Sequence, residues 1–165
     1  MRQTDVTAPR VLGPAQGLIL GPAEATDRFV LDAAETNGRL AIVEHTIASG
    51  VLAAPMHRHE REDEYSYVLE GRVGAIFDGV EVYATVGDFV RKPRGEWHTF
   101  WNAGDGPLRI LEIITPGGLE ELFRLMGAPD APPDLLDDVE HTYGCAVDEA
   151  QTTALIHRHQ LRAGP

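Results

Sequence analysis

The chain has 165 residues, of which 43% are hydrophobic and 24% are charged, and its net charge is −12. Such a composition is typical of a globular protein with its own core, and the acidity disfavours nucleic acid and anionic membranes as partners. No apolar run approaches the roughly 20 residues that cross a bilayer, and Met1–Pro14 lacks the apolar core of a signal peptide. We therefore expect a cytoplasmic protein.

The chain order predicts a single domain, 1–165, in three parts. Residues 1–34 form a polar arm followed by a strand near Gly17–Leu20, residues 35–116 form a β-rich body, and residues 117–165 form a helical extension. The β-rich body consists of short strands separated by turn sequences, with no helical pattern among them. This arrangement predicts an all-β antiparallel sandwich or barrel. The expected strands of the body are Arg39–Ala48, Tyr65–Glu70, Val73–Phe77, Val80–Thr85, Phe89–Lys92, Trp97–Trp101 and Leu108–Ile114.

The pattern changes to a helical one after Pro116-Gly117-Gly118. Apolar residues then recur at helical spacing, ending at a glycine that suits a C-cap; they are Leu119, Leu122, Phe123 and Met126, before Gly127. A second short helix is expected after Pro132-Pro133, carrying Leu135, Leu136 and Val139. The segment from Gln151 onward is only weakly periodic, and Arg162–Pro165 is expected to fray. Cys145 is the single cysteine, which excludes an intrachain disulfide, and we expect it to be a small buried side chain.

Two segments carry the donor atoms of a metal site. His57-Arg58-His59 on an extended segment places both imidazoles on one face, because strand side chains alternate. Glu64 follows an interval, Glu60–Asp63, in which irregular backbone must absorb the odd offset. His98 comes from a separate strand. Three imidazoles and one carboxylate favour one divalent transition metal (Fe, Mn, Ni, Co, Cu or Zn) and leave coordination positions open for a ligand.

Other histidines and carboxylates near these segments leave alternatives open. Glu60, Glu62 and Asp63 compete with Glu64 as the ligand, and only the register of the motif selects Glu64. His157-Arg158-His159 repeats the tripeptide without a following Glu, so we interpret it as a solvated face. His45 is expected to face solvent, and the alternative is a place in the pocket as an acid–base group.

Both segments resemble the two signature motifs of the cupins. The first motif is matched with one extra residue before the first histidine, and the second is matched in full. The matching residues are Gly50, His57, His59, Glu64 and Gly71 in the first motif, and Gly87, Pro93, Gly95, His98 and Asn102 in the second. The resemblance implies a double-stranded β-helix, the cupin jelly-roll barrel, here followed by short C-terminal helices. It also implies a metal held by His57, His59, Glu64 and His98. We expect Asn102 to cap a turn rather than to bind the metal.

The flanking segments are similar to those of quercetin dioxygenase-like bacterial monocupins. That resemblance implies a metal that binds a substrate hydroxyl or enolate, a dioxygenase-type reaction on a small aromatic, flavonol-like or enolic substrate, and Glu64 as both ligand and base. It further implies a homodimer formed through an N-terminal strand. Strand alternation predicts a pocket with Trp97 and Trp101 nearby, lined by Ser66, Val68, Phe77 (or its neighbour Ile76) and Phe100.

Two other function classes remain as alternatives. One is a metal-dependent isomerase, epimerase or lyase that needs no oxygen, and the other is a non-catalytic cupin that binds a small molecule. Sugar-phosphate isomerisation is disfavoured, because the expected pocket lacks a basic cluster. Arg91, Lys92 and Arg94 are better explained as charges on a strand edge.

Overall fold

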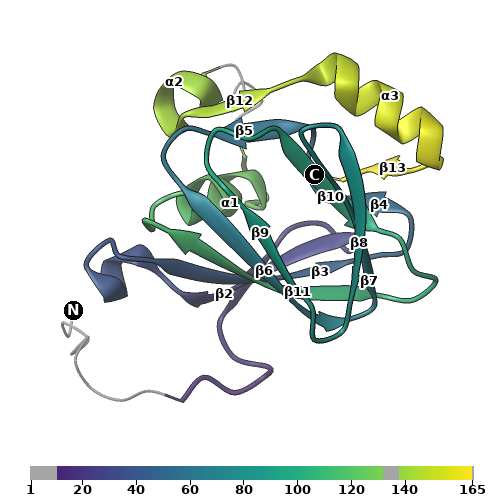
Figure 1. The fold of residues 1–165 in the computed structure, drawn as a ribbon. Helices are drawn as coiled ribbons and strands as arrows, with labels where there is room; N and C mark the ends of the chain where they lie inside the picture. The colour runs from purple at the N-terminus through teal and green to yellow at the C-terminus, as the bar shows by residue number, and fades with distance from the viewer. Residues whose placement is uncertain (1–10, 132–137, 165) are drawn as a thin grey trace.

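Two largely antiparallel β-sheets face each other across a shared interior (Figure 1). The computed structural model describes residues 11–131 and 138–164. The first sheet has the order β1 (Leu18–Leu20), β2 (Ala25–Leu31), β3 (Ala41–Ile47), β11 (Leu108–Thr115), β6 (Asp63–Glu70) and β9 (Phe89–Lys92). The second has the order β12 (Cys145–Val147), β5 (His57–His59), β10 (His98–Asn102), β4 (Val51–Leu52) and β13 (Arg162–Ala163), with β7 (Arg72–Phe77) joining β10 to β8 (Val80–Thr85).

Side-chain alternation explains why these segments are strands of a two-sheet barrel. In β11 every second residue is buried and the residues between are half-buried, as expected for a strand with one face toward a core. The inner faces of both sheets contribute to one apolar cluster, which includes Val51, Val68, Val73, Leu108 and Ile110. The predicted double-stranded β-helix is confirmed.

Turn residues hold the strands of the barrel in register. The Asn102 amide donates hydrogen bonds to the carbonyl oxygens of Ile47 and Gly106, both at 2.8 Å, and its oxygen accepts one from the backbone N–H of Gly104. Gly71 has a φ of +81°, and a Cβ there would lie 2.5 Å from the carbonyl oxygen of Pro107. Asn102 therefore caps the turn before β11, as predicted, and only glycine fits at position 71.

The C-terminal part of the chain contains α1 (Glu120–Met126), α2 (Val139–Tyr143) and α3 (Glu149–His159), and a 3₁₀ turn, Ala33–Thr36, precedes β3. The predicted first helix is confirmed. Val139 begins α2, whereas Leu135 and Leu136 lie outside the described residues. None of the helices in the described ranges has the length and apolar character needed to cross a bilayer.

The sequence missed four strands and one helix, all but one of them outside the predicted body of residues 35–116. The strands are β2, β4, β12 and β13, and the helix is α3. In α3 only Thr152 and Leu155 are buried, which explains its weak periodicity, and the Asp148 side chain caps its first turn by accepting from the backbone N–H of Gln151. The prediction that the C-terminal residues fray is wrong for Arg162–Ala163, because this segment pairs in parallel with β4.

Candidate metal centre

Four buried side chains from three strands converge inside the barrel. His57 and His59 come from β5, Glu64 from β6 and His98 from β10, and their ligand atoms all lie within 4.8 Å of one another. His98 is the cross-strand partner of His57. The backbone between β5 and β6, residues 60–62, is irregular. It provides the offset that turns Glu64 toward the histidines.

Backbone carbonyls orient two of the three imidazole rings. Nδ1 of His57 lies 2.7 Å from the carbonyl oxygen of Pro55, and Nδ1 of His98 lies 3.0 Å from that of Glu96. A carbonyl oxygen can only accept, so Nδ1 of each ring carries a proton, and in the neutral ring Nε2 is the nitrogen that can bind a metal. Nε2 of His98 lies 3.3 Å from Oε2 of Glu64. Both rings therefore present a metal-binding nitrogen to the same point.

His59 has the least satisfied polar atoms of the cluster. Within the described part of the chain both of its ring nitrogens are buried without a hydrogen-bond partner, although Nε2 lies 3.4 Å from Oε2 of Glu64. A buried ring nitrogen without a hydrogen bond costs free energy, and a bound cation would satisfy Nε2 of His59. Three histidines and a carboxylate with this geometry could hold one divalent transition metal.

The charges of the cluster are unevenly distributed. Burial, together with His98 and His59, holds the pKa of His57 well below its usual value. Burial also opposes protonation of His59, but the Glu64 carboxylate outweighs it and raises the pKa of His59 to about 10. For Glu64, burial raises the pKa, but Lys92 and His59 outweigh it and hold the pKa well below 4.5. Glu64 is thus ionised, and a bound metal would displace the proton of His59.

Lys92 lies behind Glu64 in a buried network of charges. Its Nζ is 2.7 Å from Oε2 of Glu112 and 3.3 Å from Oε2 of Glu64, and the Ser66 hydroxyl donates to Oε2 of Glu112 at 2.7 Å. The side chain of Lys92 is only 3% exposed. Burial opposes its charge, but Glu112 and Glu64 outweigh burial and raise the pKa of Lys92. The interpretation of Lys92 as a strand-edge charge is therefore wrong, whereas Arg91 and Arg94 are exposed.

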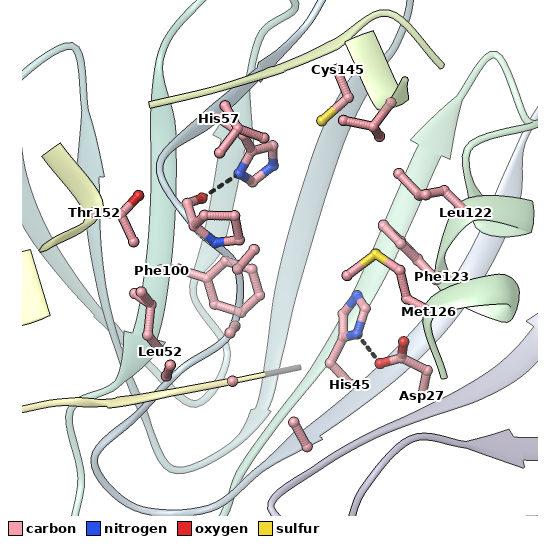
Figure 2. Close-up of a pocket in the computed structure, with 18 of the residues that line it drawn as sticks. Asp27, His45, Leu52, His57, Phe100, Leu122, Phe123, Met126, Cys145 and Thr152 are labelled. Atoms are coloured by element: carbon pink, nitrogen blue, oxygen red, sulfur yellow. Dashed lines mark hydrogen bonds and ion pairs between the residues drawn. The ribbon is translucent and has the colours of Figure 1, made fainter. Parts of the chain in front are cut away.

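A cavity of about 550 Å³ opens beside the cluster (Figure 2). Three of the four cluster residues line it: His57, His59 and Glu64. Apolar side chains form most of its wall, and they come both from the barrel and from α1 and α3. They include Leu52, Phe100, Leu122, Phe123, Met126 and Ile156. Cys145, which is buried as predicted, also lines the cavity.

The predicted pocket residues meet the cavity only in part. Phe100 lines the cavity, whereas Ser66, Val68 and Phe77 are not among its lining residues, and neither is Ile76. Ser66 instead binds Glu112, and Val68 is fully buried in the barrel core. Trp101 packs in a separate cluster with Leu155 and Leu161, and Trp97 packs against that cluster. Strand alternation correctly predicts that Ser66, Val68 and Phe100 are buried inside the barrel, but only Phe100 lies where the cavity is.

The structure places the other carboxylates and histidines that the sequence left open as candidates. Glu60 is exposed, Glu62 is buried outside the cluster, and Asp63 pairs with Arg94 at 2.7 Å. His157 and His159 lie on α3, where His159 contacts Glu81 at 3.2 Å. The expectation that His45 faces solvent is wrong, because its side chain is 12% exposed and lines the cavity beside Asp27. Asp27 lies on β2, the strand that the sequence missed.

The sequence analysis missed several residues that line the cavity, although two of them could have been recognised from the strand pattern. Glu112 occupies an inward position in the alternating strand β11, between Ile110 and Ile114. Lys92 occupies the inward side of β9, two residues after the half-buried Val90. A charged residue at an inward position is a reason to look for a buried partner. No comparable pattern identifies Asp27, and helical spacing identified Leu122, Phe123 and Met126 as an apolar helix face but not as part of a cavity.

Comparison with known families agrees with this geometry. A family model described as "Cupin domain" matches residues 43–114. Among curated proteins, "Quercetin 2,3-dioxygenase" of Bacillus subtilis (strain 168) is 28% identical over 125 residues, which are 76% of this chain and 36% of that protein. "Oxidoreductase iacF" of Pestalotiopsis fici is 45% identical over 56 residues, 33% of this chain and 28% of that protein. The chain spans about a third of the length of these relatives.

Solved structures share the fold at low sequence identity. KdgF from Halomonas sp. matches 69% of this chain and 99% of its own, with a TM-score of 0.60 and 17% identity. A protein described as a predicted oxalate decarboxylase from Thermotoga maritima matches 65% of this chain and 99% of its own, with a TM-score of 0.61 and 20% identity. These likenesses show that the fold is shared, and the family model over residues 43–114, together with the two motifs and the four-residue cluster, identifies this part of the chain as a cupin domain.

Proposed function

We propose that the chain is a metal-dependent oxidoreductase of the dioxygenase type that acts on a small aromatic, flavonol-like or enolic compound. The observation that carries this proposal is the opening of the His57, His59, Glu64 and His98 cluster onto a largely apolar cavity. The relative named quercetin 2,3-dioxygenase, which matches 76% of the chain, supports the same reaction class. In this proposal the protein resembles the quercetin dioxygenase-like monocupins.

In this proposal the residues around the cavity bind the metal, accept a proton and hold the substrate. One divalent transition metal held by the four ligands would act as a Lewis acid toward a substrate hydroxyl. Glu64 is both a ligand and the base that accepts the hydroxyl proton. Lys92 keeps the Glu64 carboxylate ionised, as the lowered pKa of Glu64 indicates. Phe100 and the apolar side chains of α1 exclude water from the cavity and hold a planar ligand.

Oxygen uptake tests this function. We expect the protein, loaded separately with Fe, Mn, Co, Ni, Cu or Zn, to consume oxygen with at least one member of a panel of flavonols and enols. Removal of the metal with a chelator should abolish the uptake, and Glu64→Gln should lower turnover on the order of 100-fold or more. The exposed His157 on α3 provides the control, and His157→Gln should retain full activity. No uptake with any metal across the panel would contradict the proposal.

A metal-dependent isomerase, epimerase or lyase is the second candidate. The observation that favours it is the Asp27–His45 pair in the cavity, since a second titratable group supports proton transfer without oxygen. Substrate turnover under strict anaerobiosis selects this candidate over the oxygenase. Tight ligand binding without turnover in air or under anaerobiosis would instead identify a non-catalytic binding cupin.

We further propose that the chain is one domain and that it forms a homodimer through β1. The packing of α1, α2 and β12 against barrel strands supports a single domain, since Leu122, Val139 and Cys145 share a core cluster with Val43 and Ile114. The exposure of β1 at the end of the first sheet supports the dimer, because Leu18 and Ile19 are 46% and 52% exposed there.

A further inference from the structure

His45 and Asp27 form an ion pair on a side of the cavity different from that of the metal ligand His57 (Figure 2). Nδ1 of His45 lies 2.6 Å from Oδ1 of Asp27, and the two residues are cross-strand partners on β3 and β2. The His45 ring packs against Phe100 and Phe123, with ring centroids 6.2 and 5.5 Å apart. The imidazole is therefore held by one hydrogen bond and two aromatic neighbours.

The second nitrogen of His45 is left available to a ligand. Within the described ranges, Nε2 of His45 makes no hydrogen bond to the protein, and the ring lines the cavity. The charged groups that face the ring are Asp27 from β2, Glu112 from β11 and Lys92 from β9. Burial opposes protonation, but Asp27 outweighs it and raises the pKa of His45. The protonated ring would donate from Nε2 to an oxygen atom in the cavity.

The lining between the two polar sides of the cavity is mostly apolar. Phe100 lies below His57 and to the left of His45 in Figure 2, and Leu122, Phe123 and Met126 from α1 lie on the side of His45. Lys92 and Glu112 also line the cavity; Nζ of Lys92 binds Oε2 of Glu112, whereas Oε1 of Glu112 has no hydrogen-bond partner among the described residues. The lining is thus suited to a flat, apolar molecule with oxygen atoms at both ends.

We propose that His45, held in place by Asp27, is a second recognition point that binds a hydroxyl or enolate oxygen of the ligand at the end remote from the metal. This inference rests on the proposed function for the class of ligand. It adds a polar anchor that neither cupin motif contains. The preferred substrates would then be aromatic or enolic compounds with an oxygen substituent far from the metal-binding hydroxyl.

Three flavonols test the proposal in the Zn²⁺-loaded protein without oxygen. 3-Hydroxyflavone carries only the metal-binding end, whereas 3,7- and 3,4′-dihydroxyflavone add one hydroxyl at either far end of the same framework. Fluorescence titration should show that at least one dihydroxyflavone binds wild type on the order of tenfold more tightly than 3-hydroxyflavone, as a charge-assisted hydrogen bond predicts. His45→Gln should remove this gain while leaving 3-hydroxyflavone binding within about twofold.

Two further variants separate recognition from folding. Asp27→Asn removes the charge behind His45 but keeps a polar side chain, so the gain should fall even if His45→Gln proves unstable. His157→Gln, on the exposed face of α3, should keep the full gain. Circular dichroism melting should show that the variants remain folded.

The outcomes separate this inference from the proposed function. If the dihydroxyflavones show no gain in wild type, or if His45→Gln keeps the gain or weakens the three probes equally, the recognition role of His45 is refuted. A gain in wild type that His45→Gln removes, without oxygen consumption in air by the protein loaded with any of the metals in the activity panel, refutes the oxygenase and leaves this inference standing. Oxygen consumption by a wild type that shows no gain in affinity for the dihydroxyflavones would support the oxygenase and refute the recognition role of His45.

Discussion

Lys92 places one buried positive charge between the buried carboxylates of Glu64 and Glu112. Two carboxylates this deep in the barrel would repel each other and lose hydration without a cation between them. Lys92 also shows where sequence reasoning fails for a single residue. Its neighbours Arg91 and Arg94 are exposed, so a basic run looked like a strand edge, although alternation places residue 92 inward.

Removal of Lys92 should therefore destabilise the metal-free protein strongly. Lys92→Met leaves the Glu112 carboxylate buried without its cation and Glu64 with His59 as its remaining cationic neighbour, so we expect a loss of about 3–5 kcal/mol in the free energy of unfolding. Urea denaturation of the metal-free protein measures this loss. The adjacent and exposed Arg91 is the control, since Arg91→Met should change the free energy by about 0.5 kcal/mol or less. Similar values for both variants would show that the network is not needed for stability.

At the scale of elements, the packing of β7 against β10 depends on a glycine that makes room for a tryptophan ring. β7 lies beside β10 over five residue pairs, with Gly74 opposite Trp101. A Cβ on Gly74 would lie 2.3 Å from Cε2 of Trp101, so the indole occupies the space that a side chain would need. Trp101 in turn packs against Leu155 of α3. Gly74 thus leaves room for the Trp101 ring, against which α3 packs on the second sheet.

Enlargement of Gly74 should disturb this packing. Gly74→Ala forces the Trp101 ring to move, and we expect it to lower the free energy of unfolding by about 1–3 kcal/mol. Gly106 is the matched control, because a Cβ there meets nothing within 4 Å. Chemical denaturation of the two alanine variants gives the comparison. If Gly74→Ala is no less stable than Gly106→Ala, the close contact between Gly74 and Trp101 does not constrain the sheet.

The C-terminal extension completes the cavity at the scale of the whole molecule. Leu122, Phe123 and Met126 from α1 and Thr152 and Ile156 from α3 line the same cavity as the metal cluster. The backbone N–H of Met56 donates to the Thr152 hydroxyl at 2.9 Å, which attaches α3 to the segment before β5. The barrel motifs alone therefore describe the metal cluster but only part of the ligand cavity.

Dimerisation is the prediction that concerns the whole molecule. An outer strand with exposed apolar side chains invites pairing with a second strand, and β1 exposes Leu18 and Ile19. Light scattering after size exclusion should give a mass near twice the 18.0 kDa of one chain. Ile19→Asp should shift the protein toward the monomer, whereas Val86→Asp, at another exposed apolar site, should not. A monomeric wild type, or an unchanged dimer in Ile19→Asp, would refute pairing through β1.

The sequence by itself determined the barrel, most of its central strands and the four residues that meet at the candidate metal centre. It could do so because alternation with period two specifies which side chains share a face, and because motif spacing sets the register of His57, His59, Glu64 and His98. Only the tertiary structure decided the roles of His45, Lys92 and the α1 side chains. Alternation indicates that a side chain points inward, but not which distant strand or helix it meets there. The contacts between Asp27 and His45 and between Lys92 and Glu112 depend on how strands separated in the chain are brought together.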